Sequence, residues 1–183
     1  MAENQATTYL TRTPDTPTNN KKYTLSVWVK VDNSNTGDYT YIMSSDGGST
    51  LREHIVFEDA AAPFLKWYSR NASSTVSNLS TNRIFRDPSA WMHLVFVYDS
   101  TAVEADRQKI YVNGVRETSF RTNTPLGADV VGQINNTTNP PKIGMLGQGT
   151  SSAQDGAFDG CMSHFHFCDG QTYDADTFGE TDA

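Results

Sequence analysis

The sequence predicts an all-β fold, an antiparallel β-sandwich of short strands, on three observations. Ser, Thr and Asn make up 51 of the 183 residues, which is typical of turn-rich β proteins and unlike a helical bundle. Short apolar segments alternate with clusters of Gly, Pro, Asn and Asp. No segment repeats its apolar residues at the period of a helix over three turns. A chain of this length can bury one core, so a single domain over residues 1–183 is expected.

The first expected strand, residues 23–31, shows the clearest alternation. Apolar side chains occupy every second position, so we expect one face of this strand to be buried. Its apolar positions are Tyr23, Leu25, Val27, Val29 and Val31. Eight further strands are expected at residues 39–44, 54–57, 64–69, 91–99, 107–112, 115–120, 142–146 and 161–167. No helical crossover separates them, so about nine antiparallel strands in a jelly roll are expected.

A tight hairpin is predicted where Asn113-Gly114 separates two of these strands. Both residue types accept the positive φ angles of a type I′ turn, whose twist matches a two-residue β-hairpin. The flanking segments, 107–112 and 115–120, are therefore expected to pair with each other.

The two cysteines, Cys161 and Cys168, lie in the last expected strand. Along an extended chain they stand roughly 23 Å apart, which is beyond disulfide reach. Free, buried thiols are therefore expected.

The charge balance removes two classes of partner. The chain carries 14 Lys and Arg against 21 Asp and Glu, a net charge of −7. An acidic protein has no general attraction for nucleic acid or for anionic membrane surfaces, so neither is an expected partner.

No apolar run approaches the roughly 18 residues of a spanning helix. The first residues lack the basic and apolar regions of a secretory signal, so no export is expected.

Four segments resemble a known family: KKYTLSVWVKVD, IFRDPSAWMHLVFVYDST, DRQKIYVNGV and AFDGCMSHFHFCDGQTYDADTFGETD. In order and spacing they resemble laminin-G-like, concanavalin A-like jelly-roll domains over about residues 9–182. More narrowly, FRDPSAW, YVNGV, FDG, DGQ and FGETD resemble the version common in virion proteins of tailed phages. The chain departs from that version at His164 and Cys168. In FDG, Phe158 is expected to fill the core edge, and Gly160 to allow a close approach of two backbones.

The resemblance implies a non-enzymatic virion protein, assembled in the host cytoplasm. It would bind host-surface glycans, or otherwise adhere to the host, as a module of a tail fibre or appendage. The alternative is an architectural role, in which the sandwich decorates or cements a capsid or tail and binds neighbouring virion proteins. A polysaccharide depolymerase is a third interpretation. Phage fibres are often trimeric, so a homotrimer is expected by analogy.

No catalytic string is present. Glucanases with a concanavalin A-like fold place two carboxylates on one strand as Glu-x-Asp-x-(x)-Glu, flanking the sugar bond. The nearest grouping here, Glu53 with Glu58 and Asp59, has the wrong spacing. Acidic residues from separate strands are the remaining route to a catalytic pair. We therefore expect a protein that is not an enzyme.

Three side chains have a spacing that suits a zinc site. His164, His166 and Cys168 stand at i, i+2 and i+4, so on an ideal strand they share one face. No fourth ligand is apparent, and surface histidines with a core cysteine are the alternative. His54 and His93 each stand alone among β residues and are expected to be structural, with their hydrogen bonds satisfied.

Four loop aspartates are weak calcium candidates, because some laminin-G-like domains bind Ca²⁺ at a loop rim through oxygen ligands. They are Asp99, Asp129, Asp155 and Asp159. The alternative is that they are solvated turn residues of an acidic protein. No metal or other cofactor is required by the sequence.

Aromatic and polar side chains near two expected strands form a candidate glycan platform. Sugar rings stack on aromatic faces, while polar groups bond the ring oxygens. The candidates are Tyr39, Tyr41, Trp67, Tyr68 and Arg70. Core packing explains any one of them equally well.

Overall fold

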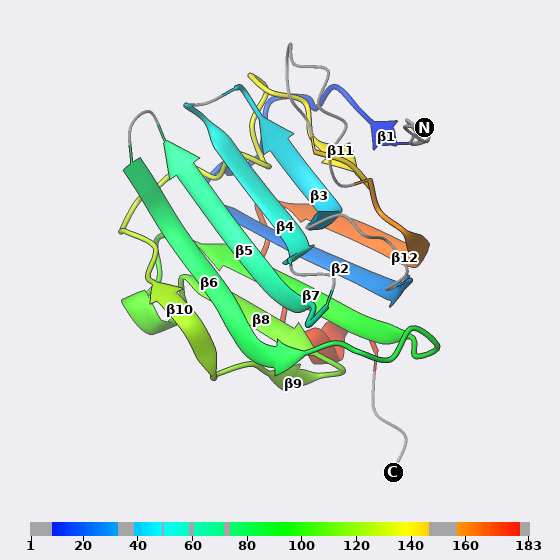
Figure 1. Cartoon of the computed structure of the whole chain (residues 1–183). Coiled ribbons are helices and arrows are strands. Elements are labelled where there is room, and N and C mark those ends of the chain that lie inside the picture. Colours follow the sequence, from blue (N-terminus) through cyan, green and yellow to red (C-terminus); the bar gives the residue numbers. More distant parts are fainter. Residues whose placement is uncertain are drawn as a thin grey trace.

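The computed structural model describes residues 9–32, 39–48, 50–58, 61–71, 74–146 and 157–179 (Figure 1). The strands are β1 (Leu10–Thr11), β2 (Lys22–Val31), β3 (Tyr39–Asp46), β4 (Arg52–Glu58), β5 (Phe64–Asn71), β6 (Ser74–Ile84), β7 (Met92–Asp99), β8 (Gln108–Val112), β9 (Val115–Arg116), β10 (Phe120–Thr124), β11 (Lys142–Ile143) and β12 (Gly160–Asp169). Two short 3₁₀-helices, η1 (Glu104–Asp106) and η2 (Ala175–Thr177), complete the elements described. None of the helices in these ranges is long and apolar enough to cross a membrane.

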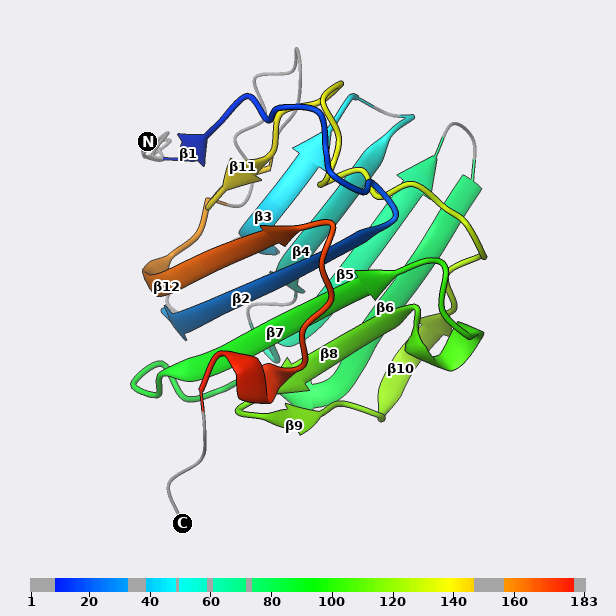
Figure 2. The same ribbon diagram turned by 180° about the vertical axis from the view of Figure 1, so that it is seen from behind.

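The strands form two antiparallel sheets that lie face to face. The large sheet has the order β1-β11-β3-β4-β5-β6-β10, and the small sheet has the order β12-β2-β7-β8-β9. Figure 1 views the molecule from the side of the large sheet, and Figure 2 from the side of the small sheet. The predicted all-β jelly-roll sandwich is confirmed.

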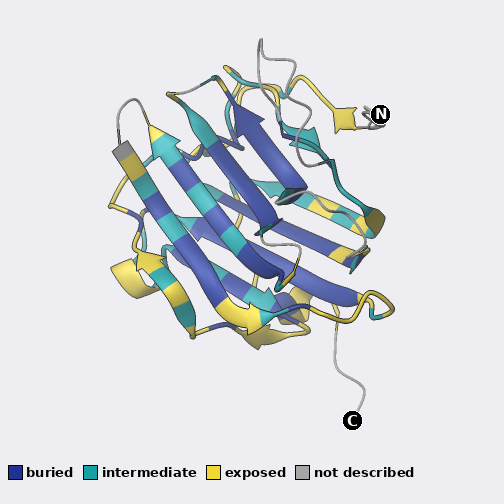
Figure 3. Cartoon of the chain, in the orientation of Figure 1, coloured by how far each residue is buried: buried dark blue, intermediate teal, exposed yellow. Residues whose placement is uncertain are grey.

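The core fills the space between the two sheets. All five apolar side chains predicted to alternate on residues 23–31 lie in it, so that prediction is confirmed. Figure 3 shows the buried residues concentrated on β2, β3, β4 and β7. The long connection from β10 to β11 adds two fully buried side chains, Leu126 and Ile134. Each sheet therefore has one face in the core and one outer face.

The largest difference from the predicted strands is β6, which the sequence does not predict. Its eleven residues, STVSNLSTNRI, hold only three apolar side chains, and irregularities in its pairing with β5 and β10 disturb their alternation. The expected strand 115–120 divides between β9 in the small sheet and β10 in the large sheet. The expected strand 142–146 shortens to β11. A polar strand is held by pairing with its neighbours, which apolar periodicity does not detect.

The predicted turn at Asn113-Gly114 and the predicted close approach of two backbones at Gly160 are both confirmed. Asn113 (φ 50°) and Gly114 (φ 78°) both adopt positive φ between β8 and β9, and Val112 pairs with Val115 across the turn. At the start of β12, Gly160 has φ 137°, and a Cβ atom there would lie 2.1 Å from the backbone oxygen of Lys30. Only glycine fits this close approach of β12 to β2.

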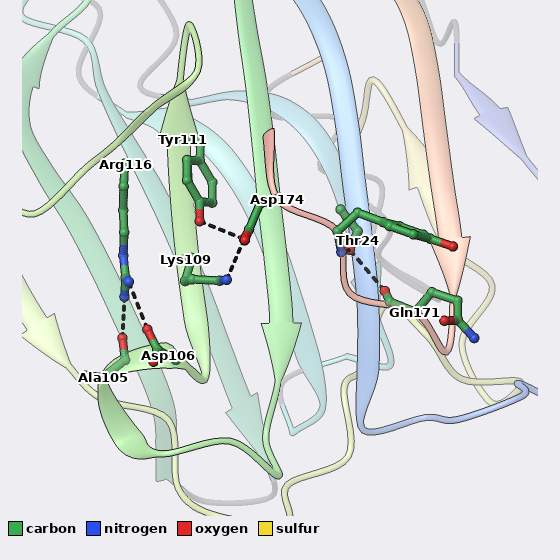
Figure 4. A network of polar contacts seen from close by, with 9 residues as sticks. Thr24, Ala105, Asp106, Lys109, Tyr111, Arg116, Gln171 and Asp174 are labelled. Atoms are coloured by element: carbon green, nitrogen blue, oxygen red, sulfur yellow. Dashed lines mark hydrogen bonds and ion pairs between the residues drawn. The ribbon is translucent and has the colours of Figure 1, made fainter. Parts of the chain in front are cut away.

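The C-terminal strap, residues 170–178, crosses the outer face of the small sheet (Figure 2). At one end, the Thr24 hydroxyl on β2 donates to the backbone oxygen of Gln171 (3.0 Å). At the other end, the Asp174 carboxylate accepts a hydrogen bond from Lys109 of β8 (2.6 Å; Figure 4). The outer face of the small sheet is therefore partly covered by the chain itself.

Candidate functional site

The outer face of the large sheet gathers aromatic and basic side chains from three neighbouring strands. Because side chains alternate along a strand, β4 and β5 each send every second residue to this outer face and the others to the core. We name the outward set the aromatic-basic face. It consists of Tyr39 and Tyr41 on β3, Arg52 and His54 on β4, and Lys66, Tyr68 and Arg70 on β5.

Four rings form a continuous row across this face. The centroid distances are 6.0 Å from Tyr39 to Tyr41, 5.4 Å from Tyr41 to His54, and 5.0 Å from His54 to Tyr68. His54 stacks on Tyr68 with an angle of 23° between the ring planes. The Lys66 ammonium lies 5.5 Å from the centroid of the Tyr68 ring. The row therefore joins aromatic surface to positive charge.

The two ends of the row are open to solvent, and its middle is closed. Tyr41 is 4% exposed and His54 is 7% exposed, and Tyr41 packs in a small cluster with Val56 and Leu146. Tyr39 and Tyr68 are half-buried, as is Arg70. The outer rings, Tyr39 and Tyr68, and the Arg70 side chain are therefore accessible from solvent, while the buried middle of the row packs against the two outer rings.

Of the five predicted glycan-platform residues, the structure brings four to the aromatic-basic face. The prediction for Trp67 is wrong. Its side chain is fully buried between the sheets, and its indole N–H donates to Glu53 (2.9 Å). Trp67 and Tyr68 are adjacent on β5, so they point to opposite sides of the sheet.

Several polar atoms on the aromatic-basic face have no hydrogen-bond partner among the residues that the structure describes. They are Nδ1 of His54 and the Nε atoms of Arg52 and Arg70, all of them buried. The prediction that His54 is fully satisfied is therefore wrong, whereas that for His93 is confirmed, since its Nε2 lies 2.9 Å from the Ser26 hydroxyl. Buried polar groups without partners are rare in folded proteins and call for an explanation.

Burial, together with the charges of Lys66 and Arg52, lowers the pKa of His54 to about 3. The folded state therefore binds this proton less readily than the unfolded chain, where the ordinary value of about 6.5 applies. Stability from the neutral imidazole is present above pH 6.5 and is lost as the pH falls toward 3. Between pH 7 and pH 5 we expect wild type to lose about 2 kcal/mol more than a His54→Phe variant. Urea denaturation of both proteins at the two pH values measures this difference, and equal losses would contradict a neutral, buried His54.

The carboxylates nearest to a glucanase string do not form a catalytic pair in this structure. Glu53 points into the core and is fully buried. Glu58 points outward and makes an ion pair with Lys66 (2.7 Å). Asp59 lies outside the described residues.

The calcium candidates do not converge on one site. Asp99 and Asp129 make ion pairs with Lys22 (2.9 Å) and Lys21 (2.8 Å), next to the start of β2. Asp159 lies beyond the other end of β2, where its backbone oxygen accepts from the Asp32 N–H (2.9 Å). Asp155 lies outside the described residues. Among the residues described, no group of three or more metal-binding side chains is brought together.

The expected zinc spacing is broken by a β-bulge. The pairing of β12 with β2 shifts register between Ser163 and His166, and His164 takes a left-handed backbone conformation (φ 48°). A bulge adds one residue to the strand, so the i, i+2, i+4 rule no longer places all three side chains on one face. Cys161 and Cys168 are free, as expected, but neither is buried: Cys161 is exposed and Cys168 is half-buried.

A groove at the open edge of the sandwich offers a second place for a ligand. It has a volume of about 640 Å³ and is rimmed by residues 10–18. Its apolar floor is formed by Met43, Ile134, Ile143, Phe165 and Phe167. The polar side chains at its base, Asn135 and Asp169, already bond each other (2.7 Å). We therefore place the candidate site on the aromatic-basic face, where polar groups lack partners.

The sequence was compared with known families. A laminin G profile, described as the concanavalin A-like lectin/glucanases superfamily, matches residues 4–175. The chain belongs to this superfamily. The expected laminin-G-like, concanavalin A-like fold is thereby confirmed. A search of curated proteins finds none that matches this concanavalin A-like chain significantly.

Several solved structures share the concanavalin A-like fold with this chain. Domain 4 of AbnA, a GH43 extracellular arabinanase from Geobacillus stearothermophilus, in complex with arabinotriose, is 18% identical, with a TM-score of 0.52 and coverage of 84% of this chain and 63% of that chain. The CBM40 domain of the Ruminococcus gnavus IT-sialidase, bound to α2,3-sialyllactose, is 12% identical, with a TM-score of 0.55 and coverage of 86% and 80%. At these identities the likeness concerns the fold alone.

A phage protein also shares this fold. The enzymatically active domain of tailspike protein 2 from bacteriophage CBA120 is 11% identical, with a TM-score of 0.57. The match covers 89% of this chain but only 24% of the tailspike chain. The concanavalin A-like chain thus corresponds to one part of that larger protein.

Sequence reasoning missed three members of the site in this concanavalin A-like chain. Arg52, His54 and Lys66 lie on the same outer face as the predicted tyrosines. Alternation within two expected strands places His54 beside Val56 and Lys66 beside Tyr68 on one face, which is a usable signal. Which residues of β4 lie opposite those of β5 depends on strand register, which the sequence alone does not reveal.

Proposed function

We propose that this protein is a non-catalytic glycan-binding module that holds a saccharide on the aromatic-basic face. The observation that carries the proposal is the partly exposed aromatic ring of Tyr68. It stacks on His54 and is flanked on its own strand by Lys66 and Arg70. The ring offers a face for a sugar, and the neighbouring cations offer hydrogen-bond donors for its oxygens.

Hydroxyl and amide groups continue the face beyond the rings. Asn78 on β6 lies directly opposite Tyr68, and Thr75 lies opposite Arg70. The Tyr68 and Thr75 hydroxyls lie 3.5 Å apart. Sugar hydroxyls both donate and accept, so a ring flanked by such groups suits a saccharide better than an apolar ligand. The similar folds that bind arabinotriose and α2,3-sialyllactose support this choice.

The proposal excludes catalysis because both described carboxylates of the candidate acid pair are already engaged. Hydrolysis by the usual mechanism needs two carboxyl groups that face the sugar bond together. Glu53 faces the core, and Glu58 is held by Lys66. A glycan on this face would therefore be held without being cut.

We further propose that the module belongs to the virion of a tailed phage, on a tail fibre or appendage, where it adheres to host glycans as part of a homotrimer. The resemblance of FRDPSAW, YVNGV and FDG to phage virion proteins supports this setting. The shared fold with the CBA120 tailspike agrees with it.

A second candidate is an architectural role in which the small sheet binds a neighbouring virion protein. Trp28 on β2 is 37% exposed, and Trp91, next to the start of β7, is 43% exposed. Exposed tryptophans are favoured as anchors in protein interfaces. Under this role, the purified chain would bind virion proteins and no sugar.

Binding to a microbial glycan array tests the glycan-binding proposal. We expect wild type to bind a defined saccharide with micromolar to millimolar affinity, and Tyr68→Ala to weaken that binding by about tenfold, since an aromatic contact contributes about 0.5–1.5 kcal/mol. Tyr173→Ala is the matched control, because Tyr173 is 38% exposed but lies on the C-terminal strap. A blank array, or equal binding by wild type and Tyr68→Ala, would overturn the proposal.

A further inference from the structure

Two arginines face each other on the aromatic-basic face. Arg52 on β4 and Arg70 on β5 are directly opposed in the antiparallel register. The Cβ atoms of directly opposed residues are about 5 Å apart, and like charges in such a pair destabilise the sheet. A pair of this kind needs a compensating negative charge, from the chain or from a ligand.

Within the described residues, a carboxylate lies beside only one of the two arginines. Nε of Arg52 lies 3.7 Å from the Asp46 carboxylate, and the same guanidinium donates to the backbone oxygen of Gly48 (3.1 Å). Arg70 makes no ion pair with any residue in the described part of the chain, and its buried Nε has no hydrogen-bond partner. A guanidinium has five donors in a fixed fork, so Arg70 keeps its binding capacity free.

The other two cations of the face each have a carboxylate nearby: Lys66 pairs with Glu58 (2.7 Å), and Arg52 lies near Asp46 (3.7 Å). Arg70 therefore stands out as the cation without a carboxylate among the described residues. Burial, and after it the charges of Lys66 and Arg52, lowers the pKa of His54. Nδ1 of His54 is buried and has no hydrogen-bond partner within the described residues. The chain as a whole carries a net charge of −7, so the gathering of three basic side chains on this face is not a general property of the surface.

We propose that the saccharide bound at this face carries a carboxylate, as sialic and uronic acids do. The Arg70 guanidinium donates two parallel hydrogen bonds to this carboxylate, and the sugar ring lies against Tyr68. Guanidinium and carboxylate are matched in planar geometry, and such pairs are among the stronger hydrogen bonds in proteins. The inference rests on the proposed glycan-binding function and names the class of its ligand.

Matched pairs of saccharides separate this inference from the general function. One pair is α2,3-sialyllactose with its methyl ester, and the other is a glucuronic acid disaccharide with its methyl ester. Titration calorimetry with wild type is expected to show at least tenfold tighter binding of one acid than of its neutral partner, weakening as salt is added.

Variants assign that preference to Arg70. In Arg70→Gln, the affinity for the acidic saccharide is expected to fall to that for its neutral partner. Arg70→Lys is expected to have an affinity between those of wild type and Arg70→Gln, since an ammonium cannot make the bidentate pair. Arg116→Gln is the control, because Arg116 lies on β9 of the small sheet and already pairs with Asp106 of η1 (2.8 Å). Circular dichroism melting of each variant confirms that it is folded.

Four results would overturn the inference, and the last of them would overturn the proposed function as well. If acid and neutral partners bind equally, the carboxylate is not recognised, although glycan binding itself stands. If sulfated saccharides bind and carboxylated ones do not, the anion is of another class. If Arg70→Gln keeps the full preference, the acid is bound elsewhere. Binding of no saccharide at all would end both the inference and the proposed function.

Discussion

Replacing Glu53 with alanine is expected to lower the free energy of unfolding by about 3–5 kcal/mol, since each buried donor that loses its partner costs about 1–3 kcal/mol. The carboxylate is fully buried and accepts hydrogen bonds from the Tyr23 hydroxyl and the Trp67 indole. It also accepts the backbone N–H groups of Gln133 (2.7 Å) and Ile134 (3.1 Å). Removing it leaves four buried donors without a partner.

Two further variants make this test specific. Glu53→Gln is also expected to be strongly destabilising, because the amide brings donors toward donors. Glu58→Ala on the same strand is the control, since its partly exposed ion pair with Lys66 contributes about 0–1 kcal/mol. Urea denaturation measures all three. A loss below about 1 kcal/mol for Glu53→Ala, within the range of an exposed ion pair, would show that the network stabilises little.

Replacing Trp67 with alanine is expected to cost about 3–5 kcal/mol, because the change opens a cavity in the core. The indole is fully buried, and its ring packs at 5.6 Å from Phe96 and 6.2 Å from Tyr23. It also donates to Glu53, so the variant leaves that carboxylate with one hydrogen bond fewer. Any loss of glycan binding by Trp67→Ala would therefore follow from unfolding.

The neighbouring residue gives the opposite expectation. Tyr68→Ala removes a half-buried ring from the outer face, so its cost to stability is expected to be about 1 kcal/mol, a typical value for a single substitution. Its effect is expected on binding. Measuring stability and glycan affinity for both variants separates the two roles, and a destabilised Tyr68→Ala beside a stable Trp67→Ala would contradict the assignment of faces.

Much of the fold was predictable because its central strands are strongly alternating. The segment 23–31 shows its apolar face in the sequence, and Asn113-Gly114 identifies its own hairpin. Alternation also bears on the site: in the expected strand 64–69, Trp67 and Tyr68 cannot share a face. The sequence alone shows that only one of these two aromatic residues faces the core. Which of them does so depends on how β5 is placed in the large sheet, with one face toward the small sheet.

The remainder depends on register, which is a property of strand pairs rather than of single strands. The opposition of Arg52 and Arg70 exists only because β4 pairs with β5 in one alignment. The carboxylate of Glu53 accepts a hydrogen bond from the backbone N–H of Gln133, which is 80 residues later in the sequence. This contact forms only because the long connection from β10 to β11 folds back onto the core. The bulge at His164 likewise has no signature in its own sequence.

That bulge bears on solubility. β12 is an edge strand of ten residues, long enough to serve as a template for a strand of another molecule. The left-handed backbone conformation at His164 interrupts the regular row of backbone groups along its outer edge. The other edge strands described, β1, β9 and β10, are two, two and five residues long. Copies crowded together would find no straight, unbroken edge on β12 to extend, which favours dispersed particles over fibrous aggregates at high concentration.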